Sequence, residues 1–296
     1  MSNIFENSIE IKEIIVHAGI FHADDVSCVA LMELVSPCVN IRREFRVDVD
    51  SIPDGTIICD IGGICSPQKR VFDHHFKELP VHRDLETPMC AFGMLWEWIA
   101  PQLGVSEAIH DKFEDEIVIP ISSQDNGKSK NPLSLMVGGF NPSWDSGEKP
   151  DDCFNKAVEV VKTMFSAWFS RAFAEERGEE IINTVVEETA ISDHPEIAVF
   201  NQYVPTGTRL VETPILFTVS PSVRGGWNAT TVKAEIVTTG FAPDKLPFPK
   251  EWRGVPEETL RQMNPGMSFC HPNGFIIACD TQEQAIGYCK KAIEMA

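Results

Sequence analysis

The run from Val71 to His75 joins two apolar residues to one carboxylate and two consecutive imidazoles. Asp and His side chains are costly to desolvate unless they are paired, and a divalent metal ion is a partner that suits both. Similar side chains follow apolar runs at three other places in the chain. These places are His17 with His22, Asp24 and Asp25, then Asp60, and finally Asp125. The sequence therefore predicts a metal site built from imidazole and carboxylate groups.

Each of these places also has a simpler interpretation. A histidine after a strand is often only hydrogen-bonded, the pair Asp24-Asp25 suits a helix N-terminus, and Asp125-Asn126-Gly127 is a common turn sequence. Taken together, four clusters of one ligand chemistry favour a shared site. Asp60 lies between the other groups in sequence and could bridge two ions about 3.5–4 Å apart.

The elements that would position these residues alternate between strands and helices. Short apolar runs at 11–16, 42–49, 56–60 and 71–75 predict strands, whereas the patterns at 23–34, 90–103 and 105–121 predict helices. This alternation predicts an α/β domain with a mainly parallel sheet flanked by helices. Ligands bind at the carboxyl ends of such strands, where His17, Asp60 and Asp73 would lie.

The rest of the chain changes character twice. Residues 126–152 are rich in Gly, Pro, Ser and Asn and predict a loop, and the phenylalanines spaced through 153–188 predict a packed helical segment. After residue 190, short β-rich runs and a last helix at 282–295 predict a smaller mixed α/β domain. We therefore expect a catalytic domain at 1–145, a helical connector at 146–190 and a substrate-binding domain at 191–296.

Composition limits the partners. The 296 residues carry 25 basic and 44 acidic side chains, a net charge of −19 that disfavours long-range attraction to nucleic acid or to an anionic membrane. The nine cysteines show no zinc-binding spacing, which predicts reduced thiols. The first residues fit neither a signal peptide nor a transit peptide, and no apolar run is long enough for a membrane span. We expect a cytoplasmic protein without a membrane partner.

Several motifs resemble those of the melanocyte-proliferating-gene (Myg) exonuclease family, a group of metal-dependent hydrolases within the DHH phosphoesterase superfamily. HAGIFHADDV, CDIGG, FDHH and QDNG resemble its N-terminal motifs, and LPFPKEWRG and FCHPNGFI resemble its C-terminal ones. One departure is Met89-Cys90-Ala91, which stands where the family usually has small hydroxyl residues. The resemblance spans nearly the whole chain and implies a DHH-type catalytic domain.

The resemblance also implies roles for single residues. One metal ion would be bound by His17, His22 and Asp60, and the other by Asp24, Asp60, His74 and Asp125. His75 would face the phosphate, and Asp73 would orient His74, so that Asp60, Asp73 and His75 form the catalytic group. Arg253 and His271 are candidates for substrate contact. Arg224 beside Gly225-Gly226 is a further candidate that could equally belong to an ordinary turn.

These observations predict a phosphoesterase with two divalent ions, Mn²⁺ being favoured and Mg²⁺ being the alternative. Its expected activity is that of an exonuclease which hydrolyses RNA or short oligonucleotides with water activated by the two ions. Two alternatives stay open, namely a hydrolase of pyrophosphate or nucleotides and a metal-binding regulatory module without catalysis. The sequence leaves the oligomeric state open, with a homodimer as one alternative.

Overall fold

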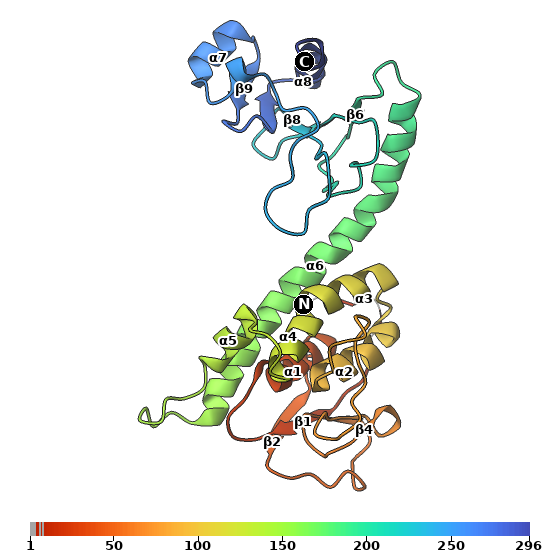
Figure 1. The fold of residues 1–296 in the computed structure, drawn as a ribbon, viewed down its shortest axis with the longest axis vertical. Coiled ribbons are helices and arrows are strands. Elements are labelled where there is room, and N and C mark those ends of the chain that lie inside the picture. Colours follow the sequence, from red (N-terminus) through yellow and green to blue (C-terminus); the bar gives the residue numbers. More distant parts are fainter. Residues whose placement is uncertain (1–3, 6, 8) are drawn as a thin grey trace. The chain divides into compact units, whose positions relative to one another are not determined.

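A computed structural model describes residues 4, 5, 7 and 9–296, and its chain divides into two compact units, 1–173 and 174–296. Both units contain a mixed sheet with helices, as the α/β prediction requires (Figure 1).

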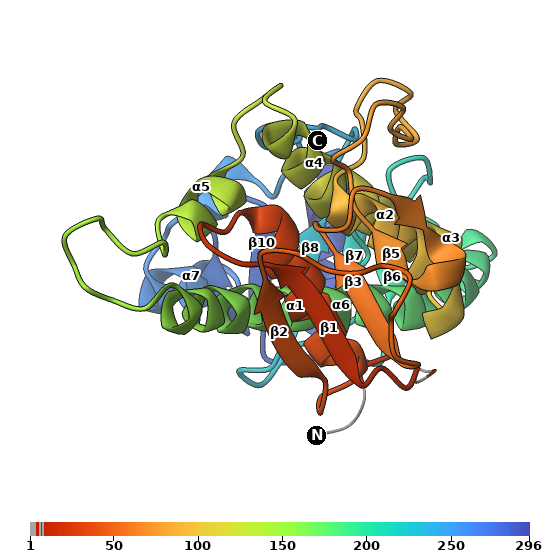
Figure 2. The same cartoon turned by 90° about the horizontal axis from the view of Figure 1, so that it is seen from below.

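The sheet of the first unit has the strand order β2-β1-β3-β5-β4. Its strands are β1 (Glu13–His17), β2 (Asn40–Glu44), β3 (Thr56–Cys59), β4 (Cys65–Ser66) and β5 (Val71–Phe72). Strands β2, β1, β3 and β5 are parallel and lie side by side in Figure 2, whereas the short β4 is antiparallel to β5. The carboxyl ends of β1, β3 and β5 therefore meet at one edge, where His17 ends β1 and where Asp60 and Asp73 directly follow β3 and β5.

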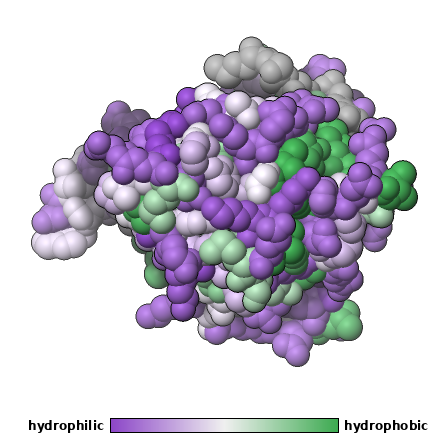
Figure 3. Space-filling view, turned by 90° about the horizontal axis from the view of Figure 1, so that it is seen from above, coloured by the Kyte–Doolittle hydropathy of each residue, from purple (hydrophilic) through white to green (hydrophobic). Residues whose placement is uncertain are grey.

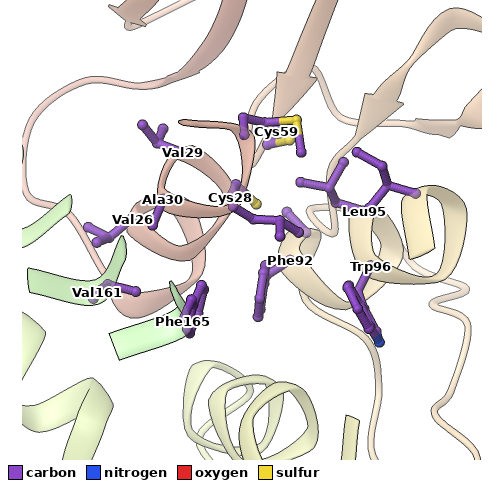
Figure 4. Close-up of a cluster of buried hydrophobic side chains, with 14 of the residues drawn as sticks. Val26, Cys28, Val29, Ala30, Cys59, Phe92, Leu95, Trp96, Val161 and Phe165 are labelled. Carbon is purple, nitrogen blue, oxygen red and sulfur yellow. The ribbon is translucent and has the colours of Figure 1, made fainter. Parts of the chain in front are cut away.

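Helices cover one face of this sheet. They include α1 (Ala23–Val35), α2 (Ala91–Ile99) and the first part of α6 (Pro150–Ala190), and Figure 4 shows their side chains pointing toward one another around Phe92 and Phe165. The opposite face carries Ile15, Ile58 and Val71. These three residues pack on Val47, Val49 and Ile52 from the loop between β2 and β3. The prediction of a sheet flanked by helices thus needs correction, because a loop provides the packing that is seen on the second face.

The remaining helices of the first unit form a nearly continuous stretch and one short separate helix. Helix α3 (Glu107–Phe113) passes through a π-helical turn (Glu114–Val118) into α4 (Ile119–Asp125). Helix α5 (Pro132–Gly138) lies inside the segment that was predicted to be a loop. Asn131 explains this difference, because its side chain accepts a hydrogen bond from the N–H of Leu133 and caps a helix that begins with proline.

Helix α6 belongs to both units. Phe154, Val161, Phe165 and Phe169 are buried in the core of the first unit, which confirms the packing role predicted for these phenylalanines. Ile182, nearer the end of the helix, is buried in a separate cluster with Ala198, Phe200 and other residues of the second unit. The boundary between the units therefore lies within this helix, where a distinct connector was expected at 146–190.

The second unit has a sheet with the order β6-β7-β8-β10-β9. Its strands are β6 (Ile197–Val199), β7 (Phe217–Pro221), β8 (Trp227–Thr231), β9 (Met267–Cys270) and β10 (Ile276–Cys279). Only β6 and β7 are parallel among the described pairs. Helix α7 (Glu257–Met263) precedes β9, and α8 (Gln282–Glu294) packs on the sheet through Ala285, Cys289 and Ala292. These elements agree with the mixed α/β pattern expected after residue 190.

The surface of the molecule is largely polar, and its helices carry polar residues. The face of the molecule in Figure 3 is mostly hydrophilic. Among the helices of the described residues, none combines the length and the apolar character that a membrane crossing needs.

Candidate metal centre

Asp60 is the central residue of the site. It directly follows β3, its backbone is left-handed with φ of 58°, and it is 4% exposed. Its two carboxylate oxygens face different histidines, with Oδ2 at 3.2 Å from Nε2 of His17 and Oδ1 at 3.2 Å from Nε2 of His74. A carboxylate that presents one oxygen to each of two ligand groups has the geometry of a bridging ligand.

The first of these groups, called the first position here, consists of His17, Asp25 and Asp60, whose ligand atoms lie within 4.8 Å of one another. Asp25 is in the first turn of α1, and its Oδ1 accepts a hydrogen bond of 2.8 Å from the N–H of His22. Its Oδ2 lies 3.3 Å from Nε2 of His17. Oδ2 of Asp25 is buried and forms no hydrogen bond among the described residues, so it is an oxygen that a cation would satisfy.

The second position consists of Asp24, His74 and Asp125 together with Asp60. Nε2 of His74 lies 3.2 Å from Oδ2 of Asp125 and 3.7 Å from Oδ2 of Asp24. Asp24 is fully buried, and its carboxylate accepts the N–H groups of Ala91 and Phe92 at the start of α2 at 3.0 and 2.6 Å. The helix N-terminus therefore fixes the orientation of this ligand.

The carboxylates and imidazoles of the site shift one another's pKa values. Burial raises the pKa of Asp25 to about 7, and burial together with the charges of Asp60 and Asp125 raises the pKa of Asp24 well above its usual value. Burial opposes the charged forms of His17 and His74, yet hydrogen bonds to Asp60 and nearby carboxylates raise the pKa of each to about 9. Burial likewise raises the pKa of Asp60, but its two histidine partners hold it at about 2. Divalent cations would take over the role of these imidazolium protons.

His75 and Asp73 form a pair beside the second position. Oδ1 of Asp73 accepts a hydrogen bond of 2.7 Å from Nδ1 of His75, and its other oxygen accepts one from the N–H of Gly63. The sequence predicted that Asp73 orients His74, so this prediction is corrected to His75. Asp73 is buried, whereas the side chain of His75 is 64% exposed. Nδ1 of His75 also lies 3.6 Å from Asp60, which keeps this pair in contact with the centre.

The structure brings together most of the predicted ligands, with two differences. His22 was predicted to share an ion with His17 and Asp60, but its side chain is exposed, and its ring centre is 6.0 Å from that of His17. Asp25 takes the place beside His17 and Asp60 that was predicted for His22. Asp125 belongs to the centre as expected, but it is the last residue of α4 and does not follow a strand.

Apart from His75, the predicted substrate residues, Arg253, His271 and Arg224, all lie in the second unit. Arg253 packs over Gly274, where an added Cβ would lie 2.5 Å from its Nε, and it donates to the carbonyl of Phe248 at 2.7 Å. His271 belongs to the same turn, since the N–H of Gly274 donates to its carbonyl at 2.8 Å. Arg253 therefore packs against the turn that contains His271. Arg224 lies in another turn, between β7 and β8, where the N–H of Ser222 donates to the carbonyl of Gly226.

The motif LPFPKEWRG contains two aromatic residues, Phe248 and Trp252, whose rings could act either as a base-stacking surface or as a hydrophobic anchor. Phe248 and Trp252 are buried in the core of the second unit and stack on each other at 6.3 Å between ring centres. The described structure therefore supports the anchor. Sequence reasoning also missed His82, a buried histidine close to the metal centre, because no strand or regular spacing precedes it.

Comparisons with known proteins agree on one family. The model of MYG1_exonuc, described as an uncharacterised protein family (UPF0160), matches residues 13–293. A MYG1 protein of Schizosaccharomyces pombe is 26% identical, with 95% of this chain and 97% of that protein covered.

Mammalian relatives are similar at the same level. A protein named MYG1 exonuclease from Mus musculus is 24% identical over 94% of this chain and 83% of its own length, and its Homo sapiens counterpart is 23% identical over 94% and 84%. No solved structure matches the chain significantly. Because the family model covers nearly the entire sequence, this chain belongs to the MYG1 exonuclease family.

Proposed function

We propose that this protein is a metal-dependent phosphodiesterase that removes nucleotides from one end of RNA or of short oligonucleotides. The observation that carries the proposal is the placement of Asp60, whose two oxygens each lie 3.2 Å from a histidine of a different ligand group. Two-ion sites of this kind are typical of phosphatases and nucleases. The name exonuclease of the mammalian relatives supports the same reaction class.

The protein's own residues would bind two divalent ions. His17, Asp25 and Asp60 would bind one, and the residues of the second position would bind the other. The mixture of imidazole and carboxylate favours Mn²⁺ over Mg²⁺, which prefers oxygen ligands. When bound, such ions activate a water molecule and neutralise charge that develops on a phosphoryl group.

His75 is the residue that would contact the scissile phosphate. Its Nδ1 is engaged by Asp73, which fixes the ring and leaves Nε2 to donate to a phosphate oxygen. The pair would therefore hold the phosphate against the centre while the buried Asp73 keeps the imidazole oriented. Arg253 and His271 are proposed as further contacts with the substrate.

The charge of the chain favours a short substrate. At a net charge of −19, the protein gains little from the release of counterions that drives binding to long nucleic acids. Recognition would depend mainly on local contacts with the terminal phosphates.

The proposal is tested with a panel of substrates in the presence of Mn²⁺. We expect a 5′-labelled oligoribonucleotide to shorten step by step from one end, and EDTA to stop the reaction. Pyrophosphate, nucleotides and a matched oligodeoxyribonucleotide complete the panel. If only pyrophosphate or nucleotides are hydrolysed, the exonuclease proposal is wrong and a small-phosphate hydrolase replaces it. Metal binding without turnover of any substrate would instead support a regulatory module.

A further inference from the structure

A second polar cluster lies buried behind the metal centre. The imidazole of His82 bridges two side chains, with Nδ1 at 2.8 Å from Oε1 of Glu114 and Nε2 at 2.8 Å from Oγ of Ser122. His82 and Glu114 are 1% exposed, and Ser122 is fully buried. Glu114 is the first residue of the π-helical turn between α3 and α4, a type of irregularity that often occurs at functional sites.

The order serine, histidine, carboxylate is that of a nucleophilic triad, but burial argues against that role. A substrate has no access to Ser122, whose Oγ is already occupied by the backbone N–H of Cys90 at 3.2 Å. The cluster must therefore act on other parts of the protein.

The cluster continues to a metal ligand through Cys90. Oγ of Ser122 donates to Sγ of Cys90 at 3.1 Å, and the Cys90 thiol lies close enough to the Asp24 carboxylate for each group to shift the pKa of the other. Cys90 is also the residue before α2, whose next two N–H groups hold that same carboxylate. We call the four residues Glu114, His82, Ser122 and Cys90 the His82 network.

The network also reaches a second ligand of the same metal position. Ser122 and Asp125 are three residues apart in α4 and therefore lie on the same side of the helix. The end of α4 is tied to the segment before α2 by Asn126, whose side-chain amide donates to the carbonyls of Pro88 at 3.0 Å and Ser122 at 2.8 Å. A displacement of Ser122 would consequently move the carboxylates of Asp24 and Asp125 together.

The fit around the imidazole leaves little freedom. A Cβ added to Gly93 in α2 would lie 2.7 Å from Cε1 of His82 and 3.3 Å from Oγ of Ser122. Only glycine allows α2 to approach the ring this closely. The helix that orients Asp24 is thus held directly against the network.

We propose, on the basis of the metal-dependent function proposed above, that the His82 network is a positioning device for the second metal position. It holds the N-terminus of α2 against α4 and thereby fixes the separation of the Asp24 and Asp125 carboxylates. Partners of metal ligands affect affinity strongly, and losing one typically weakens metal binding by about 10–100-fold.

The test compares Mn²⁺ binding to the full chain and to two serine variants of the same helix. Ser122→Ala removes the central hydroxyl of the network. Ser123→Ala is the matched control, since Ser123 is the next residue of α4 and its Oγ pairs with Oγ of Ser129 at 2.8 Å, outside the His82 network. We expect Ser122→Ala to weaken one of the two Mn²⁺ sites by about 10–100-fold and Ser123→Ala to weaken neither. Thermal unfolding in EDTA is recorded for every variant.

Cys90→Ala provides a second variant that breaks the same chain of hydrogen bonds at another link. It should weaken the same Mn²⁺ site, and the double variant should lose less than the product of the two single losses, because both changes interrupt one network. If Ser122→Ala does not fold, Cys90→Ala alone decides.

Three results would count against the reasoning. Lower stability in EDTA with unchanged Mn²⁺ affinities would show that the network is merely structural, and losses that multiply in the double variant would show that the two links act separately. A wild-type protein that binds no Mn²⁺ would refute the proposed function itself, and this is seen before any variant is compared.

Discussion

Replacing Asp60 by asparagine tests whether one carboxylate serves two metal positions. Asparagine has nearly the same size and tolerates the left-handed backbone that φ of 58° imposes, so the change removes charge without adding strain. An alanine would add a backbone cost of about 1–2 kcal/mol and would confuse the result. Since losing even a partner of a metal ligand costs about 10–100-fold in affinity, losing the shared ligand should cost at least about 100-fold at one position.

The size of the effect follows from binding linkage. At a Mn²⁺ concentration of about 100 Kd, each bound ion stabilises the folded protein by about 2.7 kcal/mol. For a unit of this size, each kcal/mol raises Tm by about 2–4 °C, so one ion should raise it by about 5–11 °C. A variant whose affinity is about 100-fold lower gains only about 0.4 kcal/mol at the same concentration, or about 1–2 °C.

The assay is thermal unfolding followed by circular dichroism, first in EDTA and then in Mn²⁺, together with the metal content of the dialysed protein. Asp54→Asn is the matched control, because Asp54 is an exposed aspartate in the turn that precedes β3, at the end of the strand away from the metal centre. It should keep the full Mn²⁺-induced shift. If the Asp60→Asn variant still binds two ions and shows the same Mn²⁺-induced increase in Tm as the wild type, Asp60 does not bridge the two positions.

Two further predictions concern other histidines. His75→Asn should lower kcat for the oligoribonucleotide by at least about 100-fold. It should leave Mn²⁺ affinity nearly unchanged, because Nδ1 of His75 is hydrogen-bonded to Asp73. An equal loss of Mn²⁺ affinity would instead make His75 a metal ligand. For His110, the hydrogen bond with Glu97 raises the pKa to about 9 from its ordinary 6.5, so its stabilising effect is complete below about pH 6.5 and disappears as the pH rises through 9. His110→Gln should therefore lower the free energy of unfolding, measured in urea, at pH 6 but not at pH 10, and equal losses at both pH values would contradict this linkage.

Most of the candidate metal ligands could be predicted from the sequence, because the apolar runs that form strands, and the polar residues at their ends, can be recognised in it. His17, Asp60 and His74 each follow a short apolar run, and parallel pairing brings the ends of such runs to one edge. The sequence could not show whether His22 or Asp25 joins His17 and Asp60 in the first position, because this depends on the direction of side chains in the first turn of α1. There Asp25 turns back to accept the N–H of His22, and this carries its second oxygen to His17.

The His82 network shows a different limit of the sequence. His82 lies in an irregular segment, and its partners are 32 and 40 residues away in the chain, so no local pattern connects them. One signal was present, because Gly93 lies inside a mostly apolar helix and a glycine at such a place often marks close packing. That signal indicates a close neighbour without identifying it.

Helix α6 has a consequence for the order in which the chain can fold during synthesis. Its first part completes the core of the first unit through Phe154, Phe165 and Phe169, so this part can dock as soon as it leaves the ribosome. Ile182 has to wait for Ala198, Phe200 and the later residues of its own cluster. A nascent chain that stops shortly after residue 190 would thus carry a folded amino-terminal unit followed by a helical segment whose apolar side still lacks its partners. We expect a chaperone to bind the chain at this stage, because apolar surface is then exposed.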